Sequence, residues 1–146
     1  MMPRMCFALV ALLVLIGPVR ADLKRALAER NLEKRAGLAL ENAVAAYKSA
    51  RTAYEKGERE ELAAAVAEVE ESVKLAHTSL TATGKDPRKS PKWFKKAEIH
   101  TRDLLRRLES FQQQMSFDDR HLLDKVKVTV QQIHDELLVG LMQGKK

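Results

Sequence analysis

Residues 31–82 read NLEKRAGLALENAVAAYKSARTAYEKGEREELAAAVAEVEESVKLAHTSLTA, and this stretch decides the fold class. On both sides of Gly57, apolar residues recur in alternating steps of three and four, which is the spacing of one face of an α-helix. Glycine commonly ends helices because it adopts the left-handed conformation readily. We therefore predict one helix over residues 22–56 and a second over 58–82, folded back on each other as an antiparallel hairpin.

The second half of the chain shows the same spacing after a linker at residues 84–91, Gly-Lys-Asp-Pro-Arg-Lys-Ser-Pro. Ser90 is a favourable N-cap and Pro91 a favourable first residue, so a third helix is predicted over 91–115. A fourth helix is predicted over 117–143, with the hydroxyl of Ser116 capping its first turn.

All four predicted helices carry an apolar repeat of seven residues, which favours nearly parallel, coiled-coil-like packing. Similar helix lengths and short connections predict an all-α, up-down-up-down four-helix bundle over residues 22–146. Two long hairpins that dimerise would use the same stripes, and this alternative stays open. The predicted stripes are Leu32, Ala36, Ala39, Ala43, Ala46, Ala50 and Ala53; Leu62, Val66, Val69, Val73, Ala76 and Leu80; Phe94, Ala97, Thr101, Leu104, Leu108, Phe111 and Met115; and Leu123, Val126, Val130, Ile133 and Leu137.

The first 21 residues have the organisation of an export signal. A short positive segment, Met1–Arg4, precedes the unbroken apolar run Met5–Gly17, and small residues follow where signal peptidase cleaves. The run is shorter than the roughly 20 residues of a membrane-spanning helix. We predict that residues 1–21 are a cleaved signal peptide and that the mature, periplasmic or secreted chain starts near Asp22. Retention of the segment as an anchor is the alternative.

The composition excludes several kinds of chemistry. The single cysteine, Cys6, lies in the predicted signal peptide, so the mature chain is expected to lack disulfides and thiolate metal ligands. Lys and Arg outnumber Asp and Glu by 26 to 20, a mild excess that does not by itself indicate a nucleic-acid partner. We find no nucleophile signature and no haem-attachment motif, and we therefore expect a non-enzymatic protein without a cofactor.

The histidines are the remaining candidates for metal ligands. No Glu precedes a His by three residues, as the di-iron site of a four-helix bundle requires. His77 and His134 each lie one position from a predicted core stripe, and they would form a metal site only if they met across the bundle. A periplasmic bundle that binds a small ligand or a metal is therefore the alternative function, without an assigned ligand set. The four histidines are His77, His100, His121 and His134.

The strongest candidate for a binding surface is the basic segment 85–96. Lysines in the first turns of a helix meet its positive end, and the free N–H groups of those turns need an acceptor. A bound anion would satisfy both. We therefore predict an interaction or structural module of the cell envelope that contacts an anionic surface or an acidic partner here, and not nucleic acid. The alternative is a solvated loop in which Trp93 or Phe94 closes the end of the bundle. The predicted contact residues are Lys85, Arg88, Lys89, Lys92, Trp93, Lys95 and Lys96.

A run of six apolar residues, 137–142, lies close to the C-terminus. One core cannot accommodate all six, because they surround the helix. We expect some of Leu138, Val139 and Met142 to be exposed, or to contact a second copy in a homodimer or another partner. Fraying of the last turns is the alternative.

Overall fold

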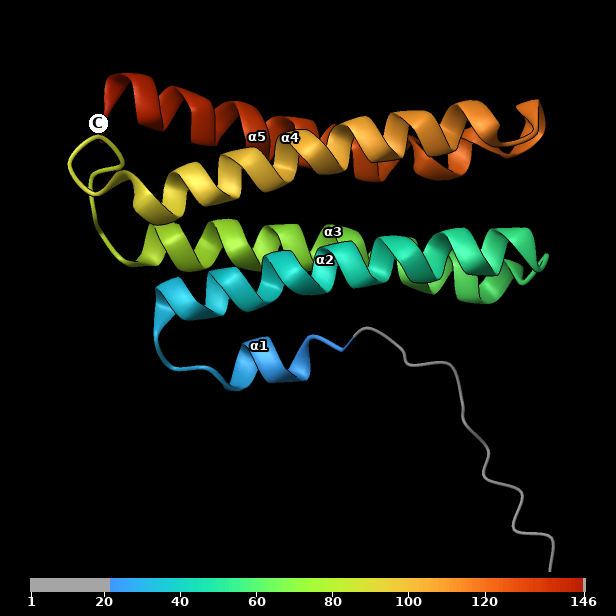
Figure 1. Ribbon diagram of the computed structural model, residues 1–146, viewed down its shortest axis with the longest axis horizontal. Coiled ribbons are helices and arrows are strands. Elements are labelled where there is room, and N and C mark those ends of the chain that lie inside the picture. The colour runs from blue at the N-terminus through green and yellow to red at the C-terminus, as the bar shows by residue number, and fades with distance from the viewer. Residues whose placement is uncertain (1–21, 146) are drawn as a thin grey trace, which may run out of the picture.

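The structure is a computed structural model that describes residues 22–145, so the predicted signal peptide lies outside the described residues. Within these residues every regular element is helical, and four long helices pack together (Figure 1). No helix in this part of the chain is long and apolar enough to cross a membrane. The elements are α1 (Lys24–Ala28), α2 (Leu32–Glu55), α3 (Arg59–Ala82), α4 (Pro91–Gln114), the 3-10 helix η1 (Phe117–Leu123) and α5 (Asp124–Gln143).

The long helices form two antiparallel hairpins that lie against each other. Helices α2 and α3 make one hairpin and α4 and α5 the other, and successive helices run in opposite directions (Figure 1). Gly57, at the turn between α2 and α3, has a φ of 71°, which confirms the left-handed role predicted for it. The linker to α4 and the last turn of α5 therefore meet at one end of the molecule, and the Gly57 turn and η1 meet at the other.

The predicted apolar stripes form the core almost completely. In this set only Leu32 and Val66 are half-buried, and every other member is buried. Alanines dominate the buried face of α2, so its backbone can approach its neighbours closely. Larger side chains from α4 and α5 fill the rest of the core. The buried alanines of α2 are Ala36, Ala39, Ala43, Ala46, Ala50 and Ala53.

The helix predicted over residues 22–56 is in fact interrupted. Glu29 is extended, with a ψ of 121°, and the short α1 folds back along α2 (Figure 1). The carboxamide of Asn31 accepts a hydrogen bond from the Lys34 backbone N–H at 2.9 Å and so caps α2. The Glu29 carbonyl also accepts a bond from the Arg35 side chain at 2.8 Å. These bonds stabilise the interruption, because they satisfy polar groups that a continuous helix would have paired internally.

The helix predicted over 117–143 begins as the 3-10 helix η1 and becomes α-helical only at Asp124. The Ser116 hydroxyl does not cap the backbone, because it bonds instead to the Asp119 carboxylate at 2.8 Å. Ser90 also makes no side-chain cap; its own N–H donates to the Asp86 carbonyl at 2.9 Å. Both serines thus lie at helix starts as predicted, but their hydroxyls do not act as predicted.

The Asp119 carboxylate attaches η1 to the α2–α3 hairpin. It accepts hydrogen bonds from Ser116, from the Tyr54 hydroxyl at 3.2 Å and from the Arg59 guanidinium at 3.1 Å. These contacts, with the Ser116 bond the largest contribution, lower the pKa of Asp119 from its ordinary value. The Tyr54 hydroxyl in turn accepts the Ser116 backbone N–H at 2.9 Å. The segment that carries Phe117 is therefore held in place at this end of the molecule.

Candidate functional site

The candidate site lies where the start of α4 packs against α2. The ring of Trp93 sits over Gly37, and a Cβ placed on Gly37 would lie only 3.1 Å from the Trp93 Cζ3 atom. A glycine inside a helix costs about 1 kcal/mol relative to alanine. Here it gives the indole ring room to approach the backbone of α2. The sequence shows this glycine but not its neighbour, so the contact could not be predicted.

Two lysines flank the Trp93 ring. The ammonium groups of Lys92 and Lys96 lie 5.6 and 5.1 Å from the ring centroid, within the range of cation–π contacts. Trp93 itself is half-buried. The indole therefore holds two positive charges at the beginning of a 24-residue helix, whose first turns already present positive charge.

The seven predicted contact residues differ in how their charges are satisfied. Lys85 is paired: its ammonium lies 2.6 Å from the Glu33 carboxylate of α2. Within residues 22–145 the other five cations make no ion pair with a carboxylate. We call these five together with Trp93 the basic surface; its members are Arg88, Lys89, Lys92, Trp93, Lys95 and Lys96.

The linker that carries the first of these cations is held by local hydrogen bonds and by packing on α5. The Asp86 carboxylate accepts the Arg88 backbone N–H at 2.9 Å, and the Asp86 carbonyl accepts the N–H of Lys89 at 3.1 Å. Pro87 packs on Gly140 of α5, where an added Cβ would lie 3.2 Å from the proline ring. Arg88 and Lys89 are thus presented by a turn that packs on the bundle, and the other members of the basic surface lie on α4.

A groove with a volume of about 410 Å³ lies beside Trp93, where α1 folds back along α2. It is shallow and open to solvent, and its lining combines apolar or small residues with charged side chains of both signs. The sequence did not reveal this groove, because its walls come from three helices and depend on the break before Asn31. The residues lining it are Arg25, Ala28, Glu29, Lys34, Gly37, Leu38, Glu41, Trp93 and Lys96.

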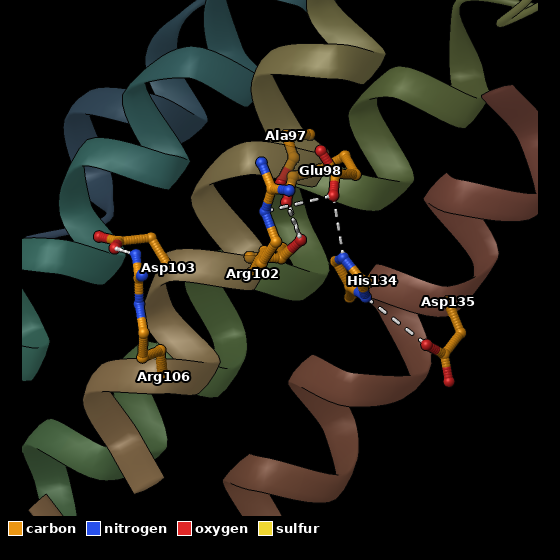
Figure 2. A network of polar contacts seen from close by, with 8 residues as sticks. Ala97, Glu98, Arg102, Asp103, Arg106, His134 and Asp135 are labelled. Carbon is orange, nitrogen blue, oxygen red and sulfur yellow. Dashed lines mark hydrogen bonds and ion pairs between the residues drawn. The ribbon is translucent and has the colours of Figure 1, made fainter. Parts of the chain in front are cut away.

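The two histidines considered as metal ligands have separate carboxylate partners on neighbouring helices. His134 of α5 lies 3.1 Å from Glu98 of α4, a carboxylate that Arg102 also approaches at 3.6 Å (Figure 2). His77 of α3 lies 3.3 Å from Glu136 of α5. Each histidine thus joins two helices. No group of three His, Cys, Asp or Glu side chains within residues 22–145 is placed to hold a metal ion.

The apolar run near the C-terminus is exposed where the sequence predicted exposure. Leu138, Val139 and Met142 are 40%, 47% and 68% exposed on the outer side of α5. Of the remaining residues of the run, Leu137 is buried, and Gly140 and Leu141 are half-buried. Contact of the exposed three with a second copy stays a prediction.

Comparisons with protein-family models, with curated proteins and with solved structures find no match to this chain. The fold places the protein in the all-α class, with four long helices packed together.

Proposed function

We propose that this protein is an exported, non-enzymatic module of the cell envelope that contacts an anionic surface or an acidic partner through the basic surface. The observation that carries the proposal is the pair of lysines around Trp93 at the start of α4, which lack carboxylate partners among residues 22–145. Lys85 is left out of the proposed contact, because Glu33 already neutralises it.

Electrostatics at the start of a helix supports this role. A cation near a helix N-terminus is unfavourable by roughly 0.3–1 kcal/mol, and the first N–H groups of the helix need an acceptor. Lys92, Lys95 and Lys96 all lie in the first two turns of α4. A carboxylate or phosphate group bound there would offset the repulsion and accept hydrogen bonds from the exposed N–H groups.

Export and the finer architecture belong to the same proposal. The apolar run Met5–Gly17, followed by small residues up to Ala21, supports removal of residues 1–21 on export. The seven-residue repeats support coiled-coil-like packing of the up-down-up-down helices. An exported chain without cysteines after Ala21 would depend on its apolar core for stability.

Binding to anionic probes with and without the lysines tests the proposal. The double variant Lys92→Glu, Lys95→Glu is expected to bind phosphatidylglycerol vesicles or polyglutamate at least about tenfold more weakly than the natural protein at low salt, because each surface cation contributes about 1 kcal/mol. Co-sedimentation measures vesicle binding, and pull-down on immobilised polyglutamate measures peptide binding. Phosphatidylcholine vesicles should not bind either protein.

Lys48→Glu, Lys56→Glu is the matched control, because it makes the same change in net charge at exposed lysines away from the basic surface. We expect this control to bind within about twofold of the natural protein. The proposal would be contradicted if both variants lost binding affinity for the anionic probes to the same extent. It would also be contradicted if the natural protein bound neither probe at low salt.

A further inference from the structure

The end of the molecule opposite the basic surface is acidic. It consists of the Gly57 turn and η1, and most of its charged side chains are exposed carboxylates. Arg59 at this end is paired with the Asp119 carboxylate, and Lys56 and Arg120 are exposed cations, so carboxylates are in the majority but positive charge is also present. The exposed carboxylates are Glu55, Glu58, Glu60, Glu61 and Asp118.

Phe117 projects from this acidic end. Its side chain is 83% exposed, the highest value among the large apolar side chains of the described residues, and Asp118 follows it directly. The hydrogen bonds of Asp119 to Ser116 and Tyr54 fix the backbone that carries it. A single exposed apolar residue is common on protein surfaces, so exposure alone indicates little. An exposed aromatic ring beside several carboxylates is a more specific feature, because a surface that combines apolar groups with positive charge would complement it.

The groove beside Trp93 has the complementary chemistry. Gly37, Leu38 and the indole ring offer apolar surface, and Lys34 and Lys96 line the same groove with positive charge. Two carboxylates also line it, so the charge is mixed. One of them, Glu29, accepts the backbone N–H of Asn31 at 3.0 Å and is therefore already engaged. The rest of the basic surface adds positive charge beside the groove.

We propose that copies of this protein associate head to tail, with Phe117 of one copy in the groove beside Trp93 of the next and Asp118 facing Lys34 and Lys96. The inference rests on the proposed function, because it identifies the acidic partner as a second copy of this chain. The two ends are separated by the length of α2, about 36 Å for 24 residues, so one copy cannot join its own ends. Each copy carries both surfaces, and such a heterologous contact gives open chains, or rings where the rotation between copies closes.

A complementation experiment by sedimentation velocity tests this arrangement. The first variant, called the knob variant, replaces the exposed pair Phe117 and Asp118 (Phe117→Ala, Asp118→Lys). The second, called the groove variant, reverses the charge of two lysines that line the groove (Lys34→Glu, Lys96→Glu). At low salt and from about 10 μM to about 1 mM, the range of weak protein contacts, the natural protein should grow beyond a dimer. Each variant alone should stay monomeric, and an equimolar mixture should stop at the dimer, since only one intact contact remains. Circular dichroism of each variant checks that it is folded.

The exposed apolar residues of α5 are the other surface through which copies could associate, and they supply the control. The variant Val139→Ser, Met142→Ser should associate as the natural protein does, because those side chains lie outside both proposed surfaces. Loss of association in this variant but not in the knob variant would overturn the proposal in favour of an α5 contact. A natural protein that stays monomeric throughout would also overturn it. If the natural protein stays monomeric but still binds polyglutamate, the proposed function holds and only the head-to-tail association is wrong. If it stays monomeric and binds no anionic probe, both proposals are wrong.

Discussion

Leu108→Ala is expected to lower the free energy of unfolding by about 3 kcal/mol, within the 2–5 kcal/mol typical of buried leucines. Leu108 is almost completely buried on the inner face of α4. The substitution removes apolar contacts with the other helices and leaves a cavity that the tightly packed core can fill only in part. Urea denaturation followed by circular dichroism measures the change.

Leu138→Ala is the matched control, because it deletes the same atoms from a leucine that is 40% exposed on α5. It should cost well under about 1 kcal/mol, since a partly exposed side chain loses less burial and leaves no closed cavity. Equal destabilisation by the two substitutions would contradict the assignment of Leu108 to the core.

Ala46→Leu is expected to lower the free energy of unfolding by about 1–3 kcal/mol through overpacking. Ala46 is fully buried on α2, in the middle of the alanine stripe that lets the helices pack closely. A leucine there needs more space than the contact between α2 and its neighbouring helices leaves. The helices must therefore separate, or the leucine side chain must adopt a strained rotamer. Thermal and urea unfolding of the purified variant measure the loss.

The neighbouring Ala45 gives a control that differs only in the face of the helix. Ala45 is exposed, so Ala45→Leu should change the free energy of unfolding by no more than about 0.5 kcal/mol. If Ala46→Leu were as harmless as Ala45→Leu, the close approach of α2 to its neighbours would be wrong.

The long helices could be predicted from the sequence because their signal is local. The spacing of Ala36 to Ala53, and of Phe94 to Met115, places each residue on its correct face without knowledge of its neighbours. The break before Asn31 could not be predicted in the same way. Asn31 is a local N-cap signal, but the interruption is also stabilised by a bond from the Arg35 side chain to the Glu29 carbonyl, which the sequence pattern does not show.

Contacts between distant residues limited the prediction of η1 and of the site. The Asp119 carboxylate accepts hydrogen bonds from Tyr54 and Arg59, which lie about sixty residues away in the chain. The same carboxylate accepts the Ser116 hydroxyl, which therefore does not cap the helix backbone. The run of cations in 85–96 is visible in the sequence, but the sequence does not show which of these cations form ion pairs with carboxylates. Lys85 is neutralised by Glu33, and the groove exists only because α1 folds back.

Trp93 is the only tryptophan in the chain, so its fluorescence reports directly whether the basic surface around it binds anionic groups. Titration with phosphatidylglycerol vesicles or polyglutamate at low salt should shift or quench the emission in a saturable way. Raising the salt to about 0.3 M should reverse the change, since surface charges are then strongly screened. An emission spectrum that stays unchanged with both probes at low salt would show that the basic surface does not bind anions.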